Sequence, residues 1–382
     1  MKIGLVICGD LDFPSGGFLY DRRLVHTLRA AGDEVEIISL PWDAYGFRLA
    51  RGRDPRLRAR LAGWRGDLLL QDELAHPSLA PANRALRRAG SMPIVSIVHH
   101  LRASEAQGAF SAAVARAAER AYLRSVDAFV FNGRATRQTV EALIGAGAPG
   151  IVAPPGGDRL APRVTEQRAA ARAREPGALR ILFLGNLIPR KGLLLLLRAL
   201  DSLPRGGWNL TIAGSPGADP AHAERVREFA REHDLQGFVH FVGHVPDDQL
   251  ALHLAASHVL AIPSEYEGFG IAYLEAMGFG VVPIGSRAGG AGEVIEDGKS
   301  GFLVSPGDWE TLAGVLRRLG GDRSLLQARS RDALRRYHEL PGWEQSMLKV
   351  RDWLGCMVYG TLALGEPRAA ARRAGAQGVG SR

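Results

Sequence analysis

Cysteine, lysine and long apolar runs are all scarce in this chain of 382 residues. Cys8 and Cys356 are its only cysteines, which excludes a disulfide framework and is typical of a reducing compartment. No apolar run reaches the roughly 18 residues that a membrane-spanning helix needs. The chain opens with MKIGLVICGDLD, which has one lysine, a short apolar run and then acids. This pattern predicts a first β-strand rather than a signal peptide, and we expect a cytoplasmic globular protein.

Acidic residues are also too few to balance the basic ones. The formal net charge is +8, and all the basic residues except four lysines are arginines. The densest basic segment is FRLARGRDPRLRARLAGWR at 47–65, in which Asp54 is the only acid. Two interpretations stay open: a solvated surface, or a patch for anionic lipid headgroups or for a phosphate-bearing acceptor. A nucleic-acid partner is not expected, because the chain carries no known nucleic-acid-binding motif.

Short β-branched runs alternate with longer helical stretches, which predicts parallel sheets with crossover helices. In the first half, strands are expected at 2–8, 34–40, 67–71, 93–98 and 126–131. In the second half, strands are expected at 179–185, 208–214, 238–243, 258–263, 281–285 and 301–306. The pattern predicts an α/β protein whose two Rossmann-type domains face each other across a central cleft.

Changes in composition suggest the domain boundaries. A stretch rich in proline and glycine, IVAPPGGDRLAP, precedes an Arg/Ala segment, and together they form the best linker in the sequence. We place the first domain at 1–160, the linker at 161–177 and the second domain at 178–340. A C-terminal helix at 341–365 is expected to cross back to the first domain. Residues 366–382 lack periodicity and are expected to be disordered.

The most informative stretch is PSEYEGFGIAYLEAMGFG at 263–280. In a doubly wound sheet, ligands bind beyond the carboxyl ends of the strands, where helix N-termini point inward. Glu267 stands in the loop after an expected strand, and Glu275 lies roughly 9 Å along the helix that follows. The amides expected to approach a phosphate are those of Gly268, Phe269 and Gly270. Two carboxylates so placed suit a nucleoside diphosphate sugar, although a surface helix with two ordinary glutamates also accounts for the residues alone.

The string SEYEGFGIAYLEAM resembles the C-terminal signature of family 4 retaining glycosyltransferases, which have the GT-B fold. The resemblance implies that Glu267 contacts the donor sugar and that Glu275 contacts the ribose hydroxyls. It extends to FLGNLIPRKGLLLLLRAL, which is similar to the family's phosphate loop and implies that Lys191 binds the donor diphosphate. Asn186 stands where the family usually has arginine. This departure weakens the expected diphosphate clamp unless Arg190 substitutes.

The first half resembles the same family more loosely. FPSGGFLYDRRLVHTLRAAG looks like the family's first glycine-rich loop and helix, which implies that Gly16 and Gly17 lie against the donor phosphates. A plain strand-to-helix turn accounts for these glycines equally well. PIVSIVHHL resembles a strand that ends in histidine, and it implies that His99 lies beside the reacting sugar. His100 replaces the aspartate that often follows.

Two further stretches carry the resemblance. GGAGEVIEDGKSGFLVSPGD at 289–308 looks like the family's glycine turn and return strand. Gly289 and Gly290 are expected to let the backbone approach the donor, and Glu293 is expected to cap or pack locally. PPGGD at 154–158 is similar to the family's interdomain hinge.

The expected function is that of a retaining glycosyltransferase, which moves a sugar from a nucleoside diphosphate sugar to a hydroxyl of a glycan, lipid or small molecule. The resemblance implies a front-face displacement aided by Glu267, His99 and Lys191. We expect no cofactor and no metal, and we interpret Asp10 and Asp12 as loop polarity. The alternatives are a degenerate sugar-nucleotide-binding partner protein and a GT-B phosphorylase or epimerase. The acceptor is not identified, and the lipid interpretation of 47–65 adds peripheral association with the inner face of the membrane.

Overall fold

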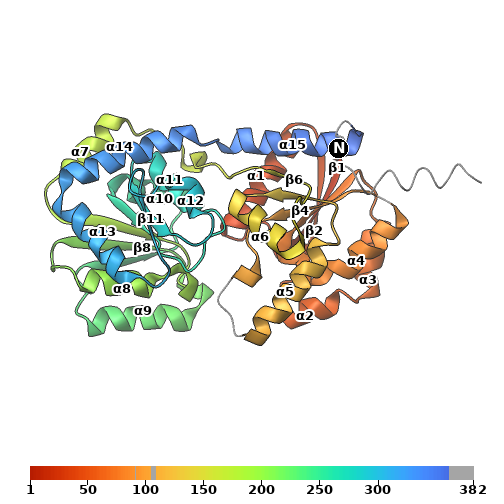
Figure 1. Cartoon of the computed structure of the whole chain (residues 1–382), viewed down its shortest axis with the longest axis horizontal. Coiled ribbons are helices and arrows are strands. Elements are labelled where there is room, and N and C mark those ends of the chain that lie inside the picture. The colour runs from red at the N-terminus through yellow and green to blue at the C-terminus, as the bar shows by residue number, and fades with distance from the viewer. Residues whose placement is uncertain (91, 105–108, 361–382) are drawn as a thin grey trace, which may run out of the picture.

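The computed structural model describes residues 1–90, 92–104 and 109–360. Within them the chain forms two α/β domains that lie side by side, and a pair of consecutive helices runs along both of them (Figure 1). Each domain contains one parallel sheet of six strands. The structure therefore confirms the predicted architecture. The expected disordered tail at 366–382 lies outside the described residues.

The first sheet has the strand order β2-β1-β3-β4-β5-β6, with every pair parallel. Its strands are β1 (Lys2–Cys8), β2 (Glu34–Leu40), β3 (Leu68–Asp72), β4 (Ile94–Val98), β5 (Ala128–Phe131) and β6 (Gly150–Val152). The sequence did not predict β6, because it is short and leads directly into the proline- and glycine-rich stretch. It pairs with β5 through Phe129 to Phe131 and so completes the sheet next to the interdomain connection.

The helices of this domain are α1 (Gly16–Ala30), α2 (Tyr45–Arg51), α3 (Pro55–Gly63), α4 (His76–Ala89), α5 (Ala109–Leu123) and α6 (Arg134–Ile144). Buried side chains of α3 to α6 pack on one face of the sheet. The opposite face packs against α1 and against a helix from the C-terminal end of the chain. Both faces are therefore covered, as apolar parallel strands require.

The second sheet has the order β12-β11-β10-β7-β8-β9. Its strands are β7 (Leu179–Leu184), β8 (Trp208–Ala213), β9 (Val239–Gly243), β10 (Val259–Ala261), β11 (Val282–Ser286) and β12 (Phe302–Val304). Its helices are α8 (Leu193–Asp201), α9 (Pro220–Glu232), α10 (Asp247–Ala256), α11 (Ile271–Gly278), α12 (Ala291–Val294), α13 (Trp309–Gly321) and α14 (Arg323–Glu339). One continuous apolar core joins these elements.

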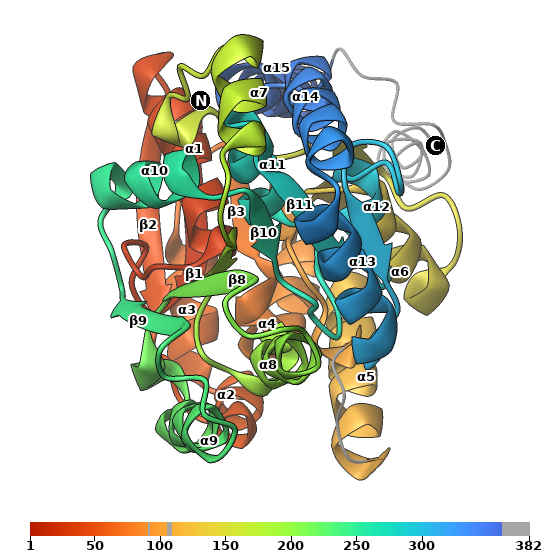
Figure 2. The same ribbon diagram turned by 90° about the vertical axis from the view of Figure 1, so that its left-hand side faces the viewer.

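The segment 161–177, which we expected to be a linker, contains a helix, α7 (Glu166–Arg174). This helix lies beside α14 on the second domain (Figure 2). Its anchor is Arg172, whose guanidinium donates hydrogen bonds to the carbonyls of Ala255 at 3.0 Å and of Phe279 at 2.8 Å. The sequence did not predict this helix, because its buried face consists of small residues and an arginine rather than of large apolar side chains.

The C-terminal helix α15 (Trp343–Tyr359) returns to the first domain, as the sequence predicted. Its buried apolar residues recur at intervals of four, three and four positions, so they occupy one face of the helix. They are Trp343, Met347, Val350 and Leu354. This face packs beside α1 and closes the core of the first domain (Figure 1).

We expect Leu354→Ala to lower the free energy of unfolding by about 2–5 kcal/mol, because it leaves a cavity in the core that α15 closes. Urea denaturation measures the change. Asp352→Ala is the control on the same helix, since its side chain is 75% exposed, and it should alter stability by less than about 0.5 kcal/mol. Equal stability of the two variants would show that α15 does not seat on the first domain.

Candidate active site

A cleft of about 1420 Å³ lies between the domains, at the carboxyl ends of both sheets. This volume exceeds the roughly 300–1000 Å³ of a typical small-molecule pocket, so two ligands have room in it. The predicted site residues that line it are Gly16, Gly17, His99, Arg190, Lys191, Glu267, Gly268, Phe269, Gly270 and Glu275. The structure thus brings the whole predicted set to one cleft.

Glu267 and Lys191 form an ion pair in the wall of the cleft. Nζ of Lys191 lies 2.6 Å from Oε1 of Glu267, and the hydroxyl of Ser264 donates to the same oxygen at 2.6 Å. Burial alone would raise the pKa of Glu267. The charges of Lys191 and Arg190 and the two hydrogen bonds outweigh burial, and the pKa is lowered. The cleft therefore holds an ionised carboxylate beside a lysine.

The glycine-rich turn after Glu267 leads into α11, which begins at Ile271. Gly270 has a φ of 99°, a left-handed conformation that favours glycine. The first amides of a helix have no acceptor within the helix. Those of α11 lie in the cleft wall, where an anionic group could bind them.

Gly289 and Gly290 pack against this turn from the same domain. The amide of Gly290 donates to the carbonyl of Glu267 at 2.7 Å. A methyl group on Gly289 would lie 2.0 Å from that carbonyl oxygen, so a side chain is excluded there. These glycines therefore bring two loops of the protein together, and their approach to the donor stays a prediction.

Glu275 lies deeper in the cleft and is 2% exposed. Oε1 accepts a hydrogen bond from Nε of Arg159 at 2.7 Å, and Oε2 accepts one from Nη2 at 3.2 Å. The same guanidinium also pairs with Asp247. Burial raises the pKa of Glu275, and the charge and hydrogen bonds of Arg159 oppose that rise. Sequence reasoning missed Arg159, although it directly follows the PPGGD hinge stretch.

His99 lies on the opposite wall, at the end of β4. Its Nε2 is 3.0 Å from Oδ1 of Asp21, and its amide donates to Glu73 at 2.9 Å. Burial alone would lower the pKa of His99, but Asp21, Glu73 and Asp72 raise it to about 10. The imidazole is therefore charged at neutral pH, and burial raises the pKa of both Asp72 and Glu73.

These acids were not predicted, although Asp72 and Glu73 stand at the carboxyl end of β3, the place where His99 stands on β4. Oxygen and nitrogen atoms of Asp21, Asp72 and His99 lie within 4.8 Å of one another, close enough to hold a metal ion. Nε2 of His99 already lies 3.0 Å from Oδ1 of Asp21, so two of these three groups contact each other. That the reaction needs no metal ion therefore remains a prediction.

Contacts between the domains surround the site. Glu293, which we expected to cap or pack locally, instead accepts hydrogen bonds from the amides of Arg134 and Ala135 at 2.8 Å each. These are the first two residues of α6, so Glu293 caps a helix of the other domain. Beside this contact, a methyl group on Gly268 would lie 2.3 Å from the carbonyl oxygen of His99. The two walls of the cleft therefore touch at the predicted site.

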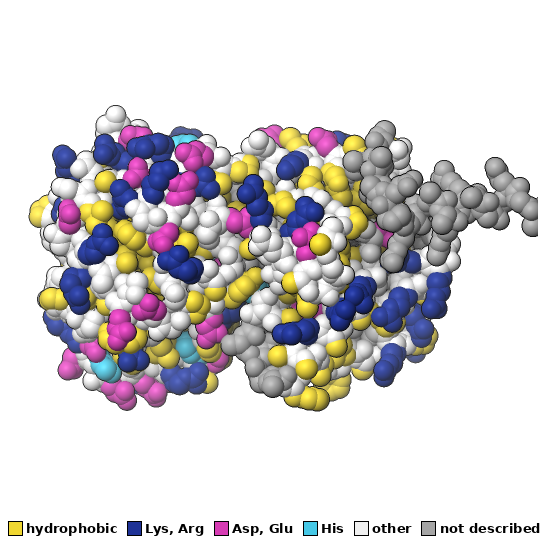
Figure 3. All heavy atoms as spheres, in the orientation of Figure 1, with side chains coloured by type: hydrophobic (Ala, Val, Ile, Leu, Met, Phe, Trp, Pro, Cys, Tyr) yellow, Lys and Arg dark blue, Asp and Glu magenta, His cyan; other side chains and the backbone are white. Residues whose placement is uncertain are grey.

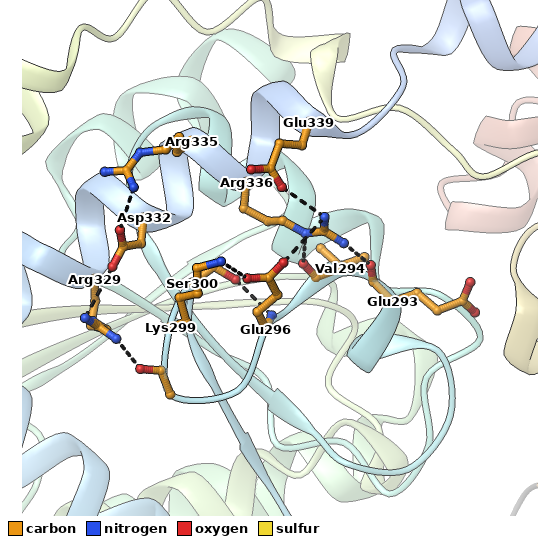
Figure 4. A network of polar contacts seen from close by, with 11 residues as sticks. Glu293, Val294, Glu296, Lys299, Ser300, Arg329, Asp332, Arg335, Arg336 and Glu339 are labelled. Carbon is orange, nitrogen blue, oxygen red and sulfur yellow. Dashed lines mark hydrogen bonds and ion pairs between the residues drawn. The ribbon is translucent and has the colours of Figure 1, made fainter.

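A polar network in the second domain holds Glu293 in place (Figure 4). The guanidinium of Arg336, on α14, donates to the carbonyl of Glu293 at 2.9 Å and to that of Val294 at 3.3 Å. It also pairs with Glu339 at 3.1 Å. Figure 4 shows the Glu293 carboxylate pointing away from this network. The backbone of Glu293 is thus fixed from one domain while its side chain binds the other.

The basic segment 47–65 forms α2, α3 and the start of the connection to β3. Its side chains Leu57, Leu61 and Trp64 are buried in the core, so they are not available to a membrane surface. Phe47 remains 73% exposed. The exposed arginines are Arg53, Arg56, Arg58, Arg60 and Arg65. Figure 3 shows Lys and Arg side chains gathered over the part of the first domain where α3 to α5 lie.

Among residues 1–90, 92–104 and 109–360, no helix combines the length and the apolar character that crossing a bilayer requires.

The sequence profile of the family glycosyl transferases group 1 matches residues 165–337. The match runs from the residue before α7 into α14. It therefore spans the sheet of the second domain, the Lys191 turn and the loop that carries Glu267.

Two curated proteins are similar over longer stretches. Glycogen synthase of Mycobacterium tuberculosis is 29% identical over 288 residues, which are 74% of this chain and 66% of that protein. The GDP-mannose-dependent alpha-(1-6)-phosphatidylinositol monomannoside mannosyltransferase of Mycolicibacterium smegmatis is 33% identical over 249 residues, which are 62% of this chain and 63% of that protein. The chain thus spans just under two thirds of the length of these relatives.

Among solved structures, sucrose-phosphate synthase from Thermosynechococcus elongatus has a TM-score of 0.80 to this chain. The alignment covers 94% of this chain and 100% of that chain at 22% identity, which shows a common fold. The chain therefore has the GT-B fold predicted from its sequence, and its second domain is similar to the family described as glycosyl transferases group 1.

Proposed function

We propose that this protein is a retaining glycosyltransferase of the family 4 type, which takes its sugar from a nucleoside diphosphate sugar. The observation that carries the proposal is the arrangement around α11. An ionised Glu267 paired with Lys191 lies on one side of the helix N-terminus, and Glu275 lies deeper on the other. A diphosphate flanked by a sugar and a ribose matches this order of charges.

The donor fits the cleft in one orientation. Its diphosphate lies at the N-terminus of α11, where free amides and the helix dipole favour an anion. Glu267 then contacts the sugar, and Glu275 accepts the ribose hydroxyls. Gly16, at the N-terminus of α1, stands close by, since a methyl group on it would lie 3.5 Å from Cδ1 of Ile271. The name of the mannosyltransferase relative, which is GDP-mannose-dependent, supports a donor of this class.

The chemistry we propose depends on charge stabilisation more than on a general base. Negative charge develops on the leaving diphosphate, and fixed cations next to it lower the barrier. Lys191 supplies one such cation. Arg190 lines the cleft beside Lys191, and its Nη1 donates a hydrogen bond to the carbonyl of Tyr266 at 2.8 Å. The family usually has an arginine where this chain has Asn186, and in our proposal Arg190 supplies that missing charge. His99 and Gly17 shape the wall on the acceptor side.

Two alternatives predict different behaviour. A phosphorylase needs inorganic phosphate, whereas an epimerase consumes the donor without any acceptor. A degenerate partner protein binds the donor and turns nothing over. Donor consumption measured with and without phosphate, and with and without a pool of acceptors, distinguishes these possibilities.

We expect one of ADP, GDP and UDP to raise the melting temperature of the wild-type protein, because binding to the native state stabilises it. Glu275→Ala should weaken that binding by about 1–3 kcal/mol, since the ribose hydroxyls lose their acceptor. Calorimetric titration measures the change. The exposed Glu310, on α13, provides the control, and Glu310→Ala should bind as wild type does. An unchanged dissociation constant in Glu275→Ala would contradict the ribose contact.

Lys191→Ala should lower kcat by about 100- to 1000-fold, the usual effect of removing a group that stabilises charge in the transition state. Its effect on donor affinity should be smaller, because leaving-group charge is greatest in the transition state. Lys299→Ala is the control, since Lys299 pairs with Glu296 at 2.7 Å on the surface. Equal losses in donor affinity and in kcat would count against this role.

We propose further that the arginines on α3 and after it attract an anionic membrane, so that the protein associates with the inner face of a membrane and its acceptor is membrane-bound. The structure supports this proposal through their exposure and through the scarcity of acids among them. The buried positions of Leu57 and Leu61 limit the contact to charge, apart from Phe47. The mannosyltransferase relative is named for a phosphatidylinositol acceptor.

Wild-type protein should pellet with anionic vesicles at low salt and release as salt screens the attraction. Replacing Arg53, Arg56, Arg58, Arg60 and Arg65 with glutamine should abolish pelleting, since each basic residue near such a surface contributes about 1 kcal/mol. The control with the same charge change replaces exposed arginines of the second domain: Arg225, Arg231, Arg317, Arg318 and Arg335. If both variants pellet alike, these arginines form only a solvated surface.

A further inference from the structure

Arg159 lines the cleft but has no part in the donor site as proposed above. It lies in the short 3-10 turn Asp158–Leu160, where the chain passes from the first domain to the second. Its Nε and Nη2 atoms donate to the two carboxylate oxygens of Glu275 at 2.7 and 3.2 Å. An arginine that contacts both oxygens fixes the plane of a carboxylate as well as its charge.

Glu275 depends on this contact. Its side chain is 3% exposed, and that of Arg159 is 17% exposed. A buried carboxylate without a cation takes up a proton rather than remain charged. Each carboxylate oxygen has two lone pairs, so an oxygen that accepts from Arg159 can still accept from a ligand hydroxyl. The pair is therefore compatible with a bound ribose.

The turn that carries Arg159 is itself held from several sides. Oδ1 of Asp158 accepts a hydrogen bond at 2.9 Å from the amide of Trp343, the first residue of α15. A methyl group on Gly157 would lie 2.6 Å from Cγ of Leu274, so the turn packs tightly against α11. Asp247, on α10, pairs with the remaining amino group of the guanidinium. The position of Arg159 relative to Glu275 is thus set by the fold.

We propose that Arg159 is a positioning residue for the donor nucleoside, which holds the Glu275 carboxylate ionised and oriented so that its oxygens accept the two ribose hydroxyls. The assignment rests on the proposed function and deepens it, because it links ribose recognition to the segment that joins the domains. In the opposite role, Arg159 would inhibit nucleotide binding, because its guanidinium would compete with the ribose hydroxyls for Glu275.

Calorimetric titration with a matched pair of ligands tests the assignment. The pair is whichever of ADP, GDP and UDP binds the wild-type protein most tightly, and its 2′,3′-dideoxy form. Arg159→Ala should weaken binding of the ordinary nucleotide by about 10- to 100-fold, the effect of losing a charged hydrogen-bonded partner. It should change binding of the dideoxy form little, because that ligand has no hydroxyls for Glu275 to accept.

Three further variants complete the design. Arg159→Lys keeps the charge but loses the planar fork, so it should restore part of the lost affinity. The double variant Arg159→Ala with Glu275→Ala should bind no more weakly than Glu275→Ala alone, since both changes remove one function. Arg163→Ala removes an exposed arginine of the same connecting segment and should bind as wild type does.

The pH dependence of binding gives a readout that a purely structural role would not move. The charged and titratable groups that face Glu275 are Arg159 from the turn, Asp247 from α10, Arg23 from α1 and Tyr337 from α14. Loss of the guanidinium raises the pKa of Glu275, so the ionised form is lost at a higher pH. As the pH falls, affinity for the ordinary nucleotide should therefore be lost at a higher pH in Arg159→Ala than in wild type.

The outcomes separate this assignment from the proposed function. If none of the three nucleotides binds the wild-type protein, the proposed function fails and the assignment with it. If wild type binds and Arg159→Ala weakens the ordinary and dideoxy forms equally, only the assignment fails, because Arg159 then supports the fold alone. Tighter binding by Arg159→Ala would overturn it in favour of the inhibitory role.

Discussion

The structure of this cleft depends on charged side chains that are buried away from water. Two of the buried acids that line it are paired with cations from distant parts of the chain: Lys191 pairs with Glu267, and Arg159 pairs with Glu275. Burying a lone carboxylate costs several kcal/mol, so removing either member of such a pair is expected to be destabilising. The pairs therefore fix the loops that carry them, and they leave the cleft with charged groups already in place for a polar ligand.

The two connections between the domains belong to the same arrangement. The first passes through the turn at Asp158 and Arg159, and the second enters α15 at Trp343. Asp158 links the two connections because it accepts a hydrogen bond from the amide of Trp343. Arg159, the next residue, binds Glu275. Glu293 adds a separate contact, in which one domain caps a helix of the other. Any relative movement of the domains must therefore either break these bonds or move the bonded residues together.

The sequence predicted what depends on local pattern. Alternation of strands and helices was sufficient for both sheets apart from the short β6, and the turn around Glu267 was sufficient to locate the cleft. The sequence did not predict features that depend on contacts between residues far apart in the chain. Helix α7 was taken for a linker because its anchor is Arg172, whose carbonyl partners are about 80 to 110 positions away in sequence. Arg159 was missed because nothing next to it in sequence shows that a buried acid faces it.

The arginines of this chain also show why composition alone is a poor guide to binding. Arg172 and Arg159 are used inside the protein, where they satisfy carbonyls and a carboxylate. Arg48, in the segment that looked most like a surface patch, is buried and donates to the carbonyl of Leu74 at 3.0 Å. A guanidinium has five donors in a rigid plane, so it can join several backbone segments where an apolar residue would join none. Part of the positive charge of this chain is thus used inside the protein, and an arginine is available to a partner only where it remains exposed, as on α3 and in the segments next to it.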